Sequence, residues 1–247
     1  MAELTAAGPV LVHFFDPTQL NSVRALPYIA EWNRRYSQLG LTTIGVHSPR
    51  FAFTADGEVA TEGIERLGIE HAVALDLDYA IWHDYGCKGW PSLFLWGHGG
   101  ALRWAHNGEG EYRATEEAIH EELRLGDIAI DLPAPMEPLR PTDAPGALVP
   151  VPTAEVLPGG SPSVPWSPEP GGSPMVIDYA AGEAWVVAQG DGKIEVAFDG
   201  EPTDTISVPP SGLAKVAGSG PHESHRVELE VSDGVRIWAV SFAPGLP

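Results

Sequence analysis

Short apolar runs alternate with helix-like segments through the first half of the chain. Residues 10–15 (VLVHFF) and 41–46 (LTTIGV) have the length and composition of buried strands. Between them, 21–39 carries apolar residues at helical spacing, and Gly40 follows as a residue that commonly ends a helix. This order predicts an α/β fold, in which helices cover a central sheet.

The same alternation continues to Gly126. We predict, in chain order, a helix at 59–67, a strand at 73–75, a helical turn at 79–85, a hairpin of strands at 92–96 and 101–106, and a last helix. That last helix is expected to begin at Thr115 as its N-cap and to end at Gly126. The first predicted domain is therefore 1–126, with helices on both faces of a mixed sheet.

The second half has a different pattern. Residues 127–174 are rich in proline and show no periodicity, which predicts a linker. Beyond it, strand-like runs alternate with glycine-containing turns, which predicts a small, all-β, jelly-roll-like sandwich at 175–247. These runs are 184–189, 193–198, 204–208, 226–231 and 235–242.

Charge and cysteine content exclude several functions. The chain has 34 acidic and 14 basic residues, a net charge of −20, and no Lys/Arg cluster that could neutralise phosphates. We therefore expect neither a nucleic-acid partner nor an anionic membrane partner. No apolar stretch reaches the ~18 residues of a membrane span, and the first residues lack the basic segment of a secretory signal. With Cys87 as the lone cysteine, we expect a cytoplasmic protein.

Four motifs carry a resemblance to a known family: RALPY at 24–28, IGVHSPRFAF at 44–53, VALDLDYAIW at 73–82 and GWPSLFL at 89–95. Through them the first domain resembles the thioredoxin-like superfamily, in its redoxin or AhpC/TSA (TlpA-like) branch. It is most similar to the soluble part of DipZ-type thiol-disulfide proteins. FDGEP at 198–202 and IWAVSF at 237–242 are similar to the carbohydrate-binding-module-like sandwich of the same proteins.

The chain departs from that family where the family carries its redox cysteines. The Cys-x-x-Cys positions correspond to Gln19 and Ser22, and His13 lies where resembling proteins carry a buried acid. Disulfide exchange needs an attacking thiolate and a second, resolving thiol. We therefore predict that disulfide oxidoreductase and peroxidase activity is absent at these positions, and we assign no catalytic residue.

The resemblance also implies a surviving binding loop. Trp90-Pro91 matches the cis-proline loop that faces the redox site in the family, where substrate peptides bind. Phe15, Pro17, Phe51 and Trp90 would line this groove. The first hypothesis is a redox-inactive module that binds a protein or peptide there, and its alternative is that these aromatic residues only form core and rim.

Cys87 supports a second function. As a small buried hydrophobic residue it would be inert. As a relocated thiol, with Lys88 to lower its pKa and His47 or His83 as a base, it would make the protein a thiol-dependent oxidoreductase or antioxidant protein, acting with Cys87 or with a partner's thiols.

Three further patterns concern polar and aromatic residues outside this groove. The Ser22 hydroxyl, near His13 and Asp16, is expected to form a helix-terminus hydrogen bond rather than to act as a nucleophile. His222 and His225 have the spacing of two metal ligands without an obvious third, so we predict no metal and no cofactor. The candidates for carbohydrate binding by the second domain are Trp185 and Trp238, whose strand positions equally fit a core.

Overall fold

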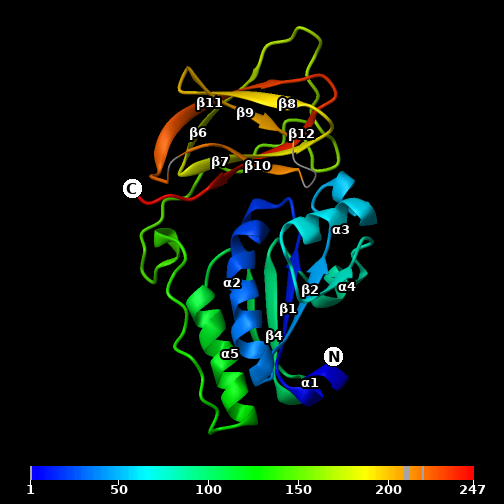
Figure 1. Ribbon diagram of the computed structural model, residues 1–247, viewed down its shortest axis with the longest axis vertical. Coiled ribbons are helices and arrows are strands. Elements are labelled where there is room, and N and C mark those ends of the chain that lie inside the picture. The colour runs from blue at the N-terminus through cyan, green and yellow to red at the C-terminus, as the bar shows by residue number, and fades with distance from the viewer. Residues whose placement is uncertain (1, 209–211, 219) are drawn as a thin grey trace. The chain divides into compact units, whose positions relative to one another are not determined.

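The structure is a computed structural model that describes residues 2–208, 212–218 and 220–247 (Figure 1). The chain divides into two compact units. Unit 1 comprises Met1–Pro49 and Ala55–Pro145, and unit 2 comprises Arg50–Thr54 and Gly146–Pro247. The two units are described separately below.

Unit 1 is built around a five-stranded sheet in the order β3-β2-β1-β4-β5. Its strands are β1 (Val10–Phe15), β2 (Thr42–His47), β3 (Ala72–Leu75), β4 (Ser92–Trp96) and β5 (Leu102–Asn107). Its helices are α1 (Ala2–Ala7), α2 (Leu20–Tyr36), α3 (Gly57–Arg66), α4 (Ala80–Tyr85) and α5 (Tyr112–Gly126). Short 3-10 turns lie at Ser37–Leu39, His98–Gly100 and Pro141–Asp143, and another spans Ala52–Ala55. β1, β2 and β3 are parallel, whereas β4 runs antiparallel to β1 and β5 antiparallel to β4.

Alternation along β1 builds a core on each face of this sheet. Leu11 packs with Trp32 of α2 and Ile119 of α5, while Val12 and Phe14 belong to the cluster on the opposite face. Side chains of successive strand residues point to opposite faces, so a strand buried on both sides is mostly apolar, and in β1 only His13 is polar. The arrangement confirms the predicted thioredoxin-like fold of the first domain.

The last helix of unit 1 begins earlier than predicted. α5 starts at Tyr112, and Thr115 is a buried residue inside the helix instead of its N-cap. The Thr115 hydroxyl donates to the Glu111 carbonyl and accepts from Trp104 Nε1, at 2.8 and 3.1 Å. A threonine whose hydroxyl bonds the carbonyl four residues back can remain within a helix, and the prediction overlooked this alternative.

Unit 2 is β-rich, as predicted. Its strands are β6 (Met175–Ala181), β7 (Glu183–Gln189), β8 (Lys193–Phe198), β9 (Glu201–Ser207), β10 (Leu213–Ala217), β11 (Glu223–Val231) and β12 (Arg236–Ala243). They form a three-stranded antiparallel sheet, β10-β7-β12, and a four-stranded antiparallel sheet, β6-β11-β8-β9. Inward-facing residues of both sheets share one core, including Val186 of β7 and Leu229 of β11.

The proline-rich tract 127–174 differs from a free linker, because it divides between the units. In unit 1 the Leu139 N–H donates to the Tyr28 hydroxyl at 2.7 Å. In unit 2, Val156 and Trp166 form antiparallel bridges with residues of β12. Proline-rich chain without internal hydrogen bonds still offers backbone groups to a neighbouring strand.

Unit 2 also takes in residues 50–54, which follow β2 in the chain. The Phe53 ring lies 5.1 Å from the Trp238 ring, measured between centroids, and Arg50 forms an ion pair with Glu155 at 2.6 Å. The Ala52 N–H donates to the Pro162 carbonyl at 3.3 Å. Among the described helices, none is long and apolar enough to cross a membrane.

Candidate functional site

The loop between α4 and β4 contains the one cis peptide bond seen in the described ranges, Trp90-Pro91. The Gly108 N–H donates to the Pro91 carbonyl at 2.7 Å. The Ser92 hydroxyl lies 2.9 Å from the side-chain oxygen of Asn107. These bonds come from β5 and the turn after it, so the neighbouring strand holds the loop in one conformation.

Trp90 is the half-buried side chain of this loop. Its indole Nε1 donates to the Ser48 carbonyl at 2.8 Å, and its ring lies 4.3 Å from that of Trp82 between centroids. Pro91 is buried beside it. The hydrogen bond and the ring contact restrict the indole while part of it remains accessible.

The first turn of α2 uses its polar groups to cap the helix. Gln19 Oε1 accepts from the Ser22 N–H at 2.8 Å, and the Ser22 hydroxyl oxygen lies 3.3 Å from the Asp16 N–H. The Asp16 carboxylate accepts from both the backbone N–H and the hydroxyl of Thr18, at 2.7 and 2.6 Å. The expected helix-terminus role of Ser22 agrees with these bonds, which supply no base to activate its hydroxyl.

His13 is completely buried on β1 and pairs with a second histidine. Its Nε2 lies 2.7 Å from Nε2 of His71, and its ring stacks on Phe15. Gly45 of β2 makes room for the imidazole, because a Cβ there would lie 3.1 Å from His13 Nε2. Burial, followed by the neighbouring His71, holds the pKa of His13 well below its usual value, and burial lowers the pKa of His71 to about 4. The pair is therefore neutral at pH 7, with one ring donating to the other.

Cys87 is buried, with 7% of its surface exposed. Burial raises the pKa of its thiol to about 11, and the negative charge of Asp76 adds to this, against an opposing hydrogen bond from Ser92. Lys88 and His83 are exposed. These surroundings favour the protonated thiol, the opposite of what a nucleophilic cysteine requires.

Three of the predicted groove residues are buried. Phe15 lies between the rings of His13 and His47, with no exposed surface. Pro17 is covered by α3, where a Cβ on Gly63 would lie only 2.8 Å from the proline ring.

Phe51 is the third of these residues, is 1% exposed and belongs to unit 2. The prediction that these three side chains line an open groove is therefore corrected, and of the predicted binding residues only Trp90 presents side-chain surface. Burial by α3 and by unit 2 depends on contacts distant in sequence, which local patterns do not reveal.

The candidates in the second domain are also explained by packing. Trp238 is 4% exposed against Phe53, and Trp185 Nε1 donates to Glu183 at 3.0 Å. Among the described residues, no group of three or more His, Cys, Asp or Glu side chains is placed to hold a metal.

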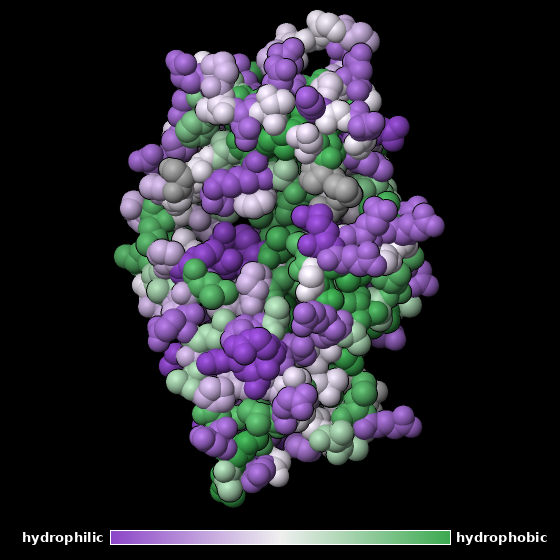
Figure 2. All heavy atoms as spheres, viewed as in Figure 1, coloured by the Kyte–Doolittle hydropathy of each residue, from purple (hydrophilic) through white to green (hydrophobic). Residues whose placement is uncertain are grey.

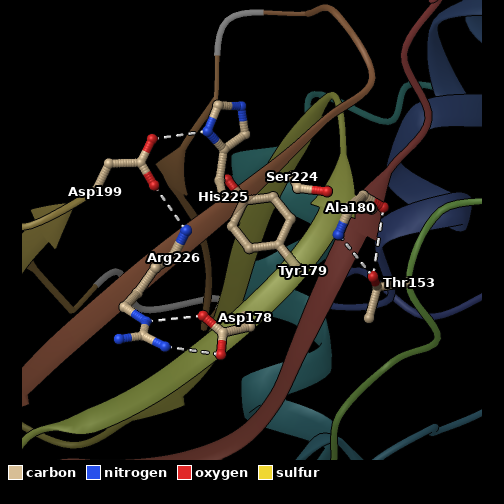
Figure 3. Close-up of a pocket in the computed structure, with 8 residues that line it drawn as sticks. All are labelled: Thr153, Asp178, Tyr179, Ala180, Asp199, Ser224, His225 and Arg226. Atoms are coloured by element: carbon tan, nitrogen blue, oxygen red, sulfur yellow. Dashed lines mark hydrogen bonds and ion pairs between the residues drawn. The ribbon is translucent and has the colours of Figure 1, made fainter.

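Unit 2 contains a polar cleft of about 560 Å³ that the sequence interpretation did not identify (Figure 3). Its lining residues are Thr153, Asp178, Tyr179, Ala180, Asp199, Ser224, His225 and Arg226. Arg226 forms a two-bond ion pair with Asp178, at 2.8 and 2.9 Å, and His225 Nδ1 lies 2.8 Å from Asp199. Both carboxylates of the cleft thus already have partners among its lining residues: Asp178 binds the Arg226 guanidinium, and Asp199 binds the Arg226 N–H and His225.

The chain is similar in sequence to several known proteins. Protein DipZ of Mycobacterium tuberculosis and Protein DipZ of Mycobacterium bovis are each 29% identical over 269 residues, covering 94% of this chain. The match spans only 38% of the length of either protein. NHL repeat-containing protein 2 of Gallus gallus is 32% identical over 119 residues, covering 43% of this chain and 16% of that protein.

Solved structures with a similar chain path include a thiol-disulfide isomerase from Corynebacterium glutamicum, with a TM-score of 0.46 and 21% identity. The match covers 50% of this chain and 85% of the isomerase chain. A putative thiol:disulfide interchange protein DsbE from Chlorobium tepidum has a TM-score of 0.44 and 21% identity, covering 48% of this chain and 82% of its own. No protein-family model matches the chain.

Proposed function

We propose that this protein, a member of the thioredoxin-like superfamily, binds a protein or peptide at its cis-proline loop and has no disulfide-exchange activity of its own. The observation that carries the proposal is the chemistry of the first turn of α2. Gln19 and Ser22 stand there, and both are engaged in capping the helix.

Disulfide exchange proceeds through a mixed disulfide, formed by one thiolate and resolved by a second thiol. An amide and a hydroxyl supply neither, and the pKa of about 11 for Cys87 keeps that thiol protonated at neutral pH. The Trp90-Pro91 loop, by contrast, has a cis peptide bond and a partly accessible indole. A rigid loop without reactive groups nearby supports a binding role.

The loop is suited to binding because it is rigid before a partner arrives. Trp90 is held by the Ser48 carbonyl and by Trp82, and the loop is bonded to the Gly108 N–H. A restricted indole loses little conformational freedom when it is covered, so more of its burial contributes to affinity. We propose an unfolded or extended polypeptide as the ligand.

The test titrates the protein with reduced, carboxymethylated α-lactalbumin, a permanently unfolded polypeptide without free thiols. We expect saturable binding, weakened about 30-fold, or ~2 kcal/mol, by Trp90→Ala. Trp185→Ala, which removes another half-buried tryptophan from unit 2, is the matched control and should leave the affinity unchanged. Equal affinity for the wild type and Trp90→Ala would contradict the proposed binding loop.

A reductase assay distinguishes the alternative function. With dithiothreitol and insulin, we expect the wild type and Cys87→Ser to give the same rate as the reagent alone. Turnover by the wild type that Cys87→Ser abolishes would instead support a thiol-dependent oxidoreductase.

A further inference from the structure

β3 forms one edge of the sheet of unit 1. The described strand order ends at β3, which pairs with β2 on its other side. The Asp76 N–H donates to the His47 carbonyl of β2 at 2.8 Å. Because the N–H and C=O of one residue in a parallel strand point to the same side, and alternate residues point to opposite sides, those of Val73 and Leu75 point away from β2.

This edge is accessible at the side chains as well. Leu75 is 43% exposed and Ala72 is exposed. The Val73 side chain packs beside Gly45 of β2, since its Cγ2 would lie 3.2 Å from a Cβ there. The strand is thus anchored on its inner side, while its outer backbone groups and Leu75 can meet an incoming chain.

Exposed carboxylates are frequent in the chain before and after this strand. From the N-cap of α3 to the start of α4 they are Asp56, Glu58, Glu62, Glu65, Glu70 and Asp78. Arg66 is the single basic residue in that stretch of the sequence. Figure 2 shows hydrophilic residues over α3, at the right of the view. Gly57 at the start of α3 lies beside Leu75, since a Cβ there would be 3.9 Å from Leu75 Cδ1, which brings the acidic helix start next to the edge.

We propose that the outer edge of β3 is a docking site for a positively charged polypeptide segment, which adds to the sheet as a further strand. The backbone groups of Val73 and Leu75 would provide the hydrogen bonds, and the surrounding carboxylates would select Lys and Arg on the incoming strand. A second copy of this chain is disfavoured, because the same carboxylates would face each other.

Charged residues beside an edge strand commonly prevent unwanted pairing between sheets. Here the charges are predominantly negative, so they repel acidic chains and attract basic ones. This site is separate from the cis-proline loop and does not depend on the proposed function.

The experiment uses the full chain and an eight-residue peptide that alternates lysine with valine. We expect the peptide to bind, to bind more weakly as salt is added, and to slow hydrogen exchange at the amides of Val73 and Leu75. The same peptide with N-methyl groups on alternate amides keeps its charge but cannot pair along one edge. It should bind at least ten-fold more weakly.

Two double variants with the same change in net charge test where on unit 1 the peptide binds. Glu65→Lys with Glu70→Lys, in the segment that leads into β3, should weaken peptide binding at least ten-fold. Glu121→Lys with Glu137→Lys makes the same change in net charge elsewhere on unit 1 and should weaken binding much less. Trp90→Ala should have no effect, which separates this result from the test of the cis-proline loop. Equal binding of the methylated peptide, or exchange protection outside β3, would overturn the proposal.

Discussion

At the scale of single residues, the site is defined by groups whose surroundings suppress reactivity. Gln19 and Ser22 cap α2, His13 and His71 share a hydrogen bond in a buried, neutral pair, and Cys87 is held as a thiol. Hydrogen bonds satisfy the polar groups of Gln19, Ser22 and the two histidines, and burial favours the neutral forms of the histidines and the thiol. None is poised to give or take a proton near pH 7.

The Cys87 thiol should therefore react slowly in the folded protein. Its pKa of about 11, against an ordinary value of 9.0, leaves about 100-fold less thiolate at neutral pH. We expect iodoacetamide at pH 7.5 to alkylate the urea-unfolded chain about 100-fold faster than the native chain, as followed by mass spectrometry. Equal rates, or faster labelling of the native chain, would show that the thiol is activated.

At the scale of elements, a segment outside the regular strands pairs with a strand edge as a further strand would. Val156 and Trp166 bond to the outer edge of β12, so the tract before β6 continues the three-stranded sheet. The Trp166 N–H and C=O exchange two hydrogen bonds with Ile237, each at 2.8 Å. The tract thus covers an edge that would otherwise present unpaired backbone groups.

Trp166 should be the main side-chain anchor of that tract, because it packs against the core of unit 2 while half-buried. Trp166→Ala is expected to lower the free energy of unfolding by about 2 kcal/mol, less than the loss of a fully buried aromatic ring. Trp166→Phe should keep most of the stability that Trp166→Ala loses. Urea unfolding followed by circular dichroism measures both variants. No loss of stability in Trp166→Ala would mean that the backbone bonds alone hold the tract.

At the scale of the whole molecule, the compact units do not follow the order of the chain. Residues 50–54 lie between β2 and α3 in sequence, yet they belong to unit 2. Phe53 is 8% exposed and contacts Trp238. Gly212 also approaches it closely, since a Cβ there would lie 3.1 Å from the Phe53 ring.

Removal of this ring should destabilise unit 2. Phe53→Ala is expected to lower the free energy of unfolding by about 3 kcal/mol, because the cavity left in the aromatic cluster cannot fully collapse. Leu148→Ala, at a residue of unit 2 with 85% exposure, is the control and should have little effect. Hydrogen exchange of the β7 and β12 amides reports on unit 2 directly. Unchanged protection in Phe53→Ala would show that the segment contributes little to its stability.

The sequence alone was sufficient for features that depend on neighbours along the chain. Apolar patterns predicted the five strands of unit 1 and five of those in unit 2, and helical spacing predicted α2 and α3, because side-chain direction follows from local backbone geometry. The strands β6 and β10 were not predicted. The absence of a thiol at Gln19 and Ser22 also needs no structure, since exchange chemistry requires sulfur. The motif around Trp90-Pro91 was enough to predict its cis peptide bond.

Tertiary structure decided which of those side chains a partner can reach. Phe15, Pro17 and Phe51 lie in or next to loops in the sequence, but residues distant along the chain bury them. His47 covers Phe15, α3 covers Pro17, and Phe51 packs inside unit 2 against Trp238. The pairing of His13 with His71, the position of Thr115 inside α5 and the open edge of β3 arise in the same way. Burial and edge exposure depend on how elements pack, and residues far apart in the sequence determine that packing.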